Sequence, residues 1–335
     1  MLQRLMHYYE RAELARTTNR KLRPFEWGLE WVIDHPNGED PRIVLERSAD
    51  RALADSDRFF ALAGPLEPEI EGETIHFQSP LVSGDPRNDR VEARYFPAAE
   101  PRGRAVVLLP HWNSPASSYV ALCKALARFG VSALRLSLPY HDGRMPEGLE
   151  RADYMVSANI GRTLHAVRQA VLDTRAALSV LEQLGYRRLG IVGTSIGSCV
   201  GYLAFTHDPR VRAAVFNHVS SYFADVIWHG ITTGHVREGI EGRLELESLR
   251  RCWAPISPFH FVAKLQEHYR PHRMISGRYD LTFPWELSQK VFDRYHSLGL
   301  PLDRVVLPCG HYSSGKVPFS WTIGYNVVSY LVRNL

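Results

Sequence analysis

The feature that most constrains this chain is an alternation of short apolar runs with longer segments of helical periodicity, which begins near residue 104. Runs that are apolar almost throughout are typical of strands covered on both faces. Such strands are expected at 104–110, 131–139, 189–193, 212–219, 272–277 and 303–308. Helices are expected at 117–128, 157–185, 195–205, 284–299 and 320–335. This alternation predicts an α/β fold with a mostly parallel central sheet flanked by helices.

Three regions fall outside this alternation. Residues 1–65 carry apolar residues at helical spacing, which predicts an N-terminal helical extension ahead of a main domain at 66–335. Two runs of period two, at 73–80 and 90–97, predict an antiparallel opening to the sheet. Between about 220 and 256 the alternation lapses, and we expect a small cap insertion there.

The composition narrows the class of protein. The chain of 335 residues has 40 basic and 36 acidic residues and no Lys/Arg-rich block, which indicates a mixed surface rather than a nucleic-acid partner. No apolar run reaches the roughly 18 residues of an integral membrane segment. The charged N-terminus lacks the apolar core of a secretory signal. Four scattered cysteines without a CxxC pair argue against a zinc site and for a reducing compartment, the cytoplasm.

A serine stands where one predicted strand turns into a helix. In Gly193-Thr194-Ser195-Ile196-Gly197 the apolar run ends at the first glycine, and a helix of small residues follows. The carboxyl edge of a parallel sheet is where α/β proteins bind ligands. Glycines on either side let strand and helix approach closely, and the helix start directs its amides at an anion forming beside Ser195. The pattern predicts a nucleophile on a sharp turn.

A serine needs a base and a third group that orients the base. Asp280 follows one predicted strand in "HRMISGRYDLTFP", and His311 follows the next in "DRVVLPCGHYSSG". Both lie at carboxyl ends of neighbouring strands, in the chain order serine, acid, histidine, so both can converge on Ser195. Asp225 is the rival acid, because it would serve if the acid followed the preceding strand.

These segments together resemble a known superfamily. The α/β-hydrolase superfamily is similar in three places, namely Gly193 to Gly197, Gly277 to Asp280 with Pro284 behind it, and Gly310-His311. The resemblance covers roughly residues 70–335, and the N-terminal stretch and "HWNSP" loop look most like an uncharacterised bacterial branch of esterase-like proteins. It implies a serine hydrolase that cleaves a carboxylic ester without a metal or cofactor. A peptidase, a thioesterase or an acyltransferase would use the same triad, and a non-catalytic binding protein could keep the fold.

The oxyanion hole is where the sequence departs from that superfamily. Two backbone amides are required, one from the residue after the nucleophile, here Ile196, and one from a loop after an earlier strand. Many members carry His-Gly in that loop, whereas this chain has His111 followed by Trp112. The second donor is therefore the amide of Trp112 or that of Asn113, and His111 is expected to orient the loop rather than to transfer protons.

Four aromatic side chains are candidates for contact with the ester substrate. Trp112 follows one strand, Tyr140 follows another, and Phe223 and Trp228 lie in the predicted cap, where aromatic rings would supply apolar area for an acyl or aryl group. The extension at 1–65 holds no triad candidate in the right order, so we expect it to supply packing rather than chemistry. The sequence leaves the oligomeric state open.

Overall fold

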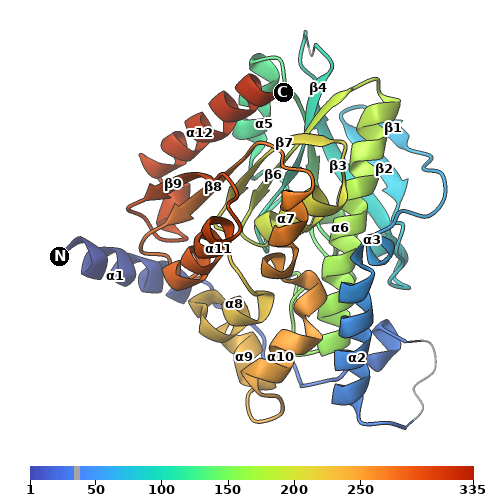
Figure 1. The fold of residues 1–335 in the computed structure, drawn as a ribbon, viewed down its shortest axis with the longest axis vertical. Helices are drawn as coiled ribbons and strands as arrows, with labels where there is room; N and C mark the ends of the chain where they lie inside the picture. The colour runs from blue at the N-terminus through green and yellow to red at the C-terminus, as the bar shows by residue number, and fades with distance from the viewer. Residues whose placement is uncertain (34–37, 101) are drawn as a thin grey trace.

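A twisted sheet forms the centre of the molecule (Figure 1). The computed structural model describes residues 1–33, 38–100 and 102–335, so positions 34–37 of the predicted extension lie outside the described residues. In the described part nine strands form one sheet, in the order β1-β2-β3-β5-β4-β6-β7-β8-β9. In chain order they are β1 (Glu69–Glu71), β2 (Thr74–Gln78), β3 (Arg90–Phe96), β4 (Arg104–Leu109), β5 (Ser132–Leu136), β6 (Arg188–Thr194), β7 (Val211–Asn217), β8 (His272–Gly277) and β9 (Asp303–Leu307).

The predicted mixture of strand directions is confirmed. β1, β2 and β3 pair antiparallel, and β3 also runs antiparallel to β5. From β5 onward all neighbours in the sheet are parallel. β4 lies between β5 and β6, so the chain moves to opposite sides after β4 and after β5. Such a reversal opens a crevice at the carboxyl ends of the strands, and the loops after β4 and β6 border it.

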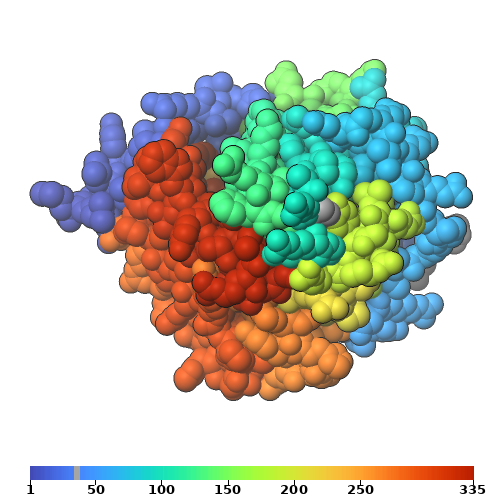
Figure 2. All heavy atoms as spheres, turned by 90° about the horizontal axis from the view of Figure 1, so that it is seen from above, coloured from blue at the N-terminus to red at the C-terminus, as the bar shows by residue number. Residues whose placement is uncertain are grey.

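Helices cover both faces of the central strands, which explains why a strand such as β4 is apolar almost throughout. Within β4, Val107 and Leu109 face one core and Val106 and Leu108 face another, and all four side chains are fully buried. The second core contains residues of α5 (Val120–Arg128) and α12 (Phe319–Asn334), which pack against each other on the face seen in Figure 2. The first contains residues of α6 (Ile160–Gln183), α7 (Ile196–His207) and α11 (Trp285–Ser297).

In the described part of the N-terminal extension, the α-helices lie near its two ends. α1 (Leu2–Ala15) begins it, and α2 (Pro41–Ala54) and α3 (Ser56–Phe59) end it, with a single 3-10 turn, η1 (Leu29–Trp31), among the described residues between α1 and α2. The prediction of helix was wrong between α1 and η1. There the backbone of Glu26 bonds instead to the residues that open α6, with its amide 3.1 Å from the Ala158 carbonyl. Pro24, which lacks an amide proton, also disfavours a helix through this stretch.

The lapse in alternation corresponds to helices between β7 and β8. They are α8 (Phe223–His229), η3 (Ile231–Thr233), α9 (Gly234–Ile240), α10 (Leu246–Cys252), η4 (Ala254–Ile256) and η5 (Pro258–Gln266). Shorter elements elsewhere are α4 (Pro86–Asp89), η2 (Asp142–Arg144) and η6 (Ser313–Gly315). None of the helices in the described ranges is long and apolar enough to cross a bilayer.

Candidate active site

Ser195 sits on a strained turn between β6 and α7. Its φ of 59° lies in the left-handed region, which for a residue with a side chain costs on the order of 1–3 kcal/mol. The flanking glycines are required by space. A Cβ on Gly193 would lie 2.2 Å from the Gly197 carbonyl oxygen, and one on Gly197 would lie 2.4 Å from the Leu109 carbonyl oxygen. The close approach of β4, β6 and α7 therefore holds the serine at the sheet edge.

The structure brings the three predicted triad residues into contact. Oγ of Ser195 lies 3.1 Å from Nε2 of His311, and Nδ1 of His311 lies 2.9 Å from Oδ2 of Asp280. Oδ1 of Asp280 accepts the amides of Thr282 and Phe283, each at 2.7 Å. These amides fix the carboxylate, the carboxylate orients the imidazole, and the imidazole reaches the serine hydroxyl.

The charges at this site favour an ionised acid beside a basic histidine. Burial by itself raises the pKa of Asp280, but the neighbouring histidines and the hydrogen bonds to the carboxylate outweigh it, so the pKa falls well below the ordinary range. Burial by itself lowers the pKa of His311, and the Asp280 charge outweighs it, so the pKa rises above 6.5. The pair can therefore hold a proton taken from a hydroxyl.

A second histidine, which the sequence analysis missed, shares the same carboxylate. Nδ1 of His218 lies 2.7 Å from Oδ2 of Asp280, and its ring is 4.4 Å from that of His311. Burial, and then the charge of His311, lower the pKa of His218. These three side chains could also place their ligand atoms around a metal ion. A metal there would displace the contacts that link Asp280 to Ser195. The sequence did contain a signal for His218, because this histidine follows directly after the last residue of strand β7.

The two candidate oxyanion donors in the loop after β4 differ in their hydrogen bonding. The amide of Asn113 donates to Nε2 of His141 at 2.8 Å, while Nδ1 of His141 lies 2.9 Å from the Pro139 carbonyl. Burial lowers the pKa of His141 to about 4, so its ring is neutral and accepts that bond. Within the described residues the amide of Trp112 has no acceptor. Ile196 opens α7, where helical geometry leaves the amide without an intrahelical partner.

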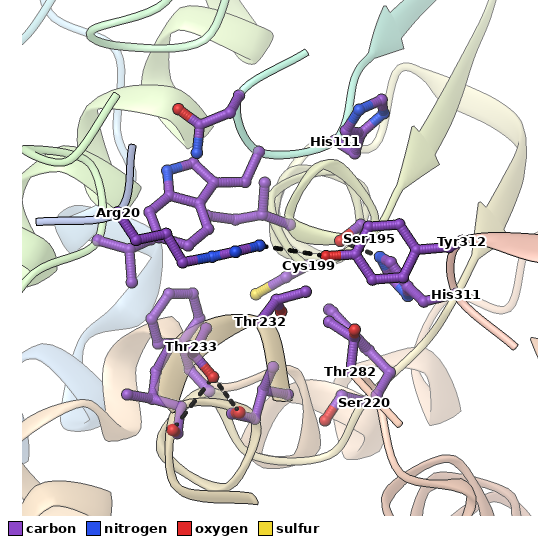
Figure 3. A pocket seen from close by; sticks show the side chains of 18 of the residues that line it. Arg20, His111, Ser195, Cys199, Ser220, Thr232, Thr233, Thr282, His311 and Tyr312 are labelled. Carbon is purple, nitrogen blue, oxygen red and sulfur yellow. Dashed lines mark hydrogen bonds between the residues drawn. The ribbon is translucent and has the colours of Figure 1, made fainter. Parts of the chain in front are cut away.

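A cavity of about 290 Å³ opens over the serine (Figure 3). Its apolar lining comes mainly from the β4 loop, from α7 and from the cap: Trp112, Val156, Ile196, Cys199, Phe223, Val226, Ile227, Pro258 and Phe283. Both Ser195 and His311 belong to the lining. The size suits a small molecule or one chain of a larger one.

Comparison with solved structures decides the fold. The chain is similar to the acylaminoacyl peptidase of Pyrococcus horikoshii, with a TM-score of 0.59, 16% identity and coverage of 82% of this chain and 42% of that one. It is also similar to an esterase of Pyrococcus furiosus, with a TM-score of 0.54, 16% identity and coverage of 80% and 93%. The chain has the α/β-hydrolase fold.

A further neighbour of the same fold is a cold-adapted esterase from an Arctic intertidal metagenomic library, with a TM-score of 0.51, 20% identity and coverage of 82% of this chain and 99% of that one. The chain thus spans less than half the length of the peptidase and nearly all of this esterase. No protein-family model matches the sequence, and no curated protein matches it. At these identities the likeness establishes the α/β-hydrolase fold alone.

The rival acid and two of the predicted pocket residues lie elsewhere in this α/β-hydrolase fold. Asp225 is buried in α8, where its carboxylate bonds to Arg250 at 2.6 Å. Tyr140 is buried and its ring lies edge-on to that of Tyr154. Trp228 packs beneath Arg237, whose Cζ atom lies 5.4 Å from the centroid of the Trp228 ring. Of the four predicted contact residues, Trp112 and Phe223 are the two on the cavity lining.

The N-terminal extension reaches the histidine loop through α1. Glu10 of α1 is fully buried, and its carboxylate accepts the amide of Tyr312 at 2.9 Å and the amide and hydroxyl of Ser313 at 3.0 Å. A Cβ on Gly310 would lie 2.3 Å from the Glu10 carboxyl carbon. α1 therefore holds the segment on either side of His311. The sequence offered no signal, because Glu10 is one of many charged residues on an amphipathic helix.

Proposed function

We propose that this protein is a serine hydrolase that cleaves a carboxylic ester through an acyl-enzyme intermediate. The observation that carries the proposal is the unbroken series of contacts from Ser195 through His311 to Asp280, on the lining of a cavity with apolar walls. The strained turn that carries the serine supports it, because backbone strain persists where the surrounding structure over-determines it and gathers at functional sites. The esterases among the fold neighbours are consistent with it.

In the proposed reaction Ser195 attacks the acyl carbon while His311 takes the hydroxyl proton. His311 then gives the proton to the leaving alcohol, and Asp280 stabilises the imidazolium in between. The oxyanion accepts hydrogen bonds from the amides of Ile196 and Trp112. We assign the second donor to Trp112 rather than Asn113, because the Asn113 amide is already bonded to a histidine ring. Water then cleaves the acyl-enzyme, and these steps require no metal or organic cofactor.

A peptidase is the second candidate, favoured by the fold likeness to an acylaminoacyl peptidase. A thioesterase or an acyltransferase would use the same residues, and a non-catalytic binding protein is the alternative from another class. Intact protein should react with a fluorophosphonate probe, and Ser195→Ala should neither react nor turn over, with a loss on the order of 10⁴-fold or more. A panel of acyl esters, thioesters and peptides then identifies the bond cleaved. Labelling that persists in Ser195→Ala contradicts the proposal.

We further propose a reducing compartment, the cytoplasm, as the location. Support comes from the four cysteines, all of which are buried and free. For Cys199 and Cys309, both close to the site, burial raises the pKa of the thiol, to about 12 for Cys309. Neither is therefore a thiolate that could replace the serine.

A further inference from the structure

The cavity over Ser195 carries an unbalanced positive charge. Among the described residues on its lining, Arg20 and Arg151 are the arginines, and there is no aspartate or glutamate. Arg20 comes from the extension, just after α1, and Arg151 precedes α6, so the chain brings two guanidinium groups from distant segments to one wall. Figure 3 shows Arg20 reaching across the cavity towards Tyr312, the residue after His311.

Arg20 is held in place by neutral groups that do not offset its charge. Its guanidinium donates to the carbonyls of Leu14 and Thr17 at 3.0 and 2.9 Å, and to the hydroxyl of Tyr312 at 3.2 Å. No carboxylate of the described chain lies within ion-pair distance of it, and its buried Nε finds no acceptor there. The side chain is therefore oriented for binding and retains an unsatisfied donor.

Arg151 is 8% exposed and only loosely paired. Its Nη1 donates to the neutral Oδ1 of Asn19 at 3.2 Å, and its Nε lies 3.5 Å from Oδ1 of Asp153 without a hydrogen bond, while Asp153 also pairs with Arg23 at 3.2 Å. Arg151 and Arg23 therefore share one carboxylate, and Arg20 has none within ion-pair distance. A buried charge without a full partner is costly, and an anion from outside would offset that cost.

No other titratable group of the described chain supplies a carboxylate to the cavity lining. Glu10 keeps its charge, but its carboxylate bonds to the amides of the His311 loop and forms no ion pair with Arg20 or Arg151. His235 stacks on Trp112, and burial lowers its pKa to about 4, so it is neutral. Asp280 lies behind His311, which separates it from the cavity.

We propose that Arg20 and Arg151 form an anion subsite, so that the substrate carries a carboxylate or phosphate group close to the bond that is cleaved. This inference rests on the hydrolase proposed above. A guanidinium group binds either anion through two parallel hydrogen bonds. The apolar side of the cavity, at Phe223 and Ile227, takes the hydrocarbon part of the same molecule.

The test compares matched esters that differ only in charge. The carboxylate arm uses para-nitrophenyl hydrogen glutarate and its neutral methyl ester, and the phosphate arm uses dibutyrylglycerol phosphate and dibutyrylglycerol. The unmodified protein should show a higher kcat/KM for the charged member of at least one pair. Arg20→Gln should reduce the charged-to-neutral ratio on the order of ten- to a hundredfold, as expected for lost hydrogen bonds to a charged group. Arg151→Gln should reduce it as well.

Two controls separate recognition from folding. Arg16→Gln removes an arginine from the same segment whose side chain is exposed and pairs with Glu13, and it should leave the ratio unchanged. Fluorophosphonate titration gives the concentration of folded sites in each variant, so a loss of stability does not count as a loss of preference. Arg20→Lys, which keeps the charge but not the planar fork, should lie between wild type and Arg20→Gln.

The outcomes distinguish this inference from the proposed function. Cleavage of neutral esters without preference for either charged partner, or a ratio that Arg20→Gln and Arg151→Gln both leave unchanged, overturns the anion subsite alone. No labelling and no cleavage of any ester overturns the hydrolase. In that case calorimetry of Ser195→Ala with monomethyl glutarate and with inorganic phosphate still decides the subsite. Binding that Arg20→Gln abolishes supports the subsite, and no binding of either anion contradicts it.

Discussion

Asp280 is the most heavily bonded side chain of the candidate site. One carboxylate oxygen accepts two backbone amides, and the other contacts both His311 and His218. Amides that hold one oxygen leave the other pointing at the imidazole, so the direction of His311 is set by the turn that follows β8. A carboxylate fixed in this way orients the base without needing to take its proton.

Single substitutions of Asp280 and of Asp225 should show which of the two carboxylates orients the histidine. Asp280→Asn should lower kcat on the order of 10⁴-fold, because an amide favours the wrong tautomer of His311. Asp225→Asn is the matched control, since Asp225 is equally buried but pairs with Arg250, and its effect should be on stability. Steady-state kinetics with a neutral ester and thermal unfolding of both variants measure this. The acid is misassigned if Asp225→Asn abolishes turnover and Asp280→Asn does not.

Two aromatic residues of the cap should differ in their effect on selectivity. Phe223 lines the cavity, whereas Trp228 packs under Arg237. Phe223→Ala should therefore change discrimination between short and medium acyl esters by ~1–3 kcal/mol, the range for one or two methylene contacts. Trp228→Ala should leave that discrimination as it is. The measurement is kcat/KM across an ester series, and a uniform slowing by Phe223→Ala would mean that the acyl chain lies elsewhere.

At the scale of elements, α1 acts on the site through Glu10. In Glu10→Gln the amide group of the new side chain would face backbone N–H donors of the His311 loop, so kcat should fall and the loop should loosen. The Glu10 charge also raises the pKa of His311. Since the reaction requires neutral His311, activity falls as pH drops through that pKa, and loss of the charge should move this acidic limb to lower pH.

The matched control for this prediction lies one turn further along the same helix. Glu13 pairs with the exposed Arg16 rather than with the histidine loop. The pH profile of kcat/KM for Glu13→Gln should therefore coincide with that of the unmodified chain. If the acidic limb of the pH profile does not shift in Glu10→Gln and kcat is unchanged, Glu10 contributes only to packing.

At the scale of the whole molecule, the extension and the α/β-hydrolase body share one core. Leu45 of α2 and Phe60, next to α3, are fully buried in the cluster that also contains α6 and α7. The ring of Phe60 contacts His207 and Phe261 of the body. The boundary near residue 65 therefore divides the sequence without dividing the buried core.

This shared core predicts a single cooperative unfolding transition for the full chain. Deletion of residues 1–65 should expose the apolar surface of the body that the extension covers, and should lower the thermal midpoint or abolish soluble expression. Circular dichroism and intrinsic fluorescence should give coincident melting curves for the full chain. A soluble truncation with an unchanged midpoint and an altered ester preference would instead identify the extension as a lid.

The sequence by itself predicted the main strands and helices of the body and the chain order of the candidate catalytic residues. Strands that are buried on both faces must be apolar, so they can be recognised from short runs of the sequence. The turn that carries Ser195 can be recognised in the same way, because the strand before it, the two glycines around it and the helix after it are all close in sequence. The alternation predicted an α/β fold with a mostly parallel sheet, the resemblance of three segments implied the α/β-hydrolase fold, and both are confirmed. Asp280 and His311 were identified because each stands directly behind a strand, and parallel strands bring their carboxyl ends together.

Only the tertiary structure decided which side chains meet across distant segments. Glu10 and Arg20 reach the site because α1 and the residues behind it lie against the His311 loop, and no local pattern encodes that contact. The choice of Trp112 over Asn113 depends on His141, which arrives from another loop. Local periodicity reports what a residue's own helix or strand requires, whereas these contacts depend on how whole elements pack, and packing is fixed only when all of them fold together.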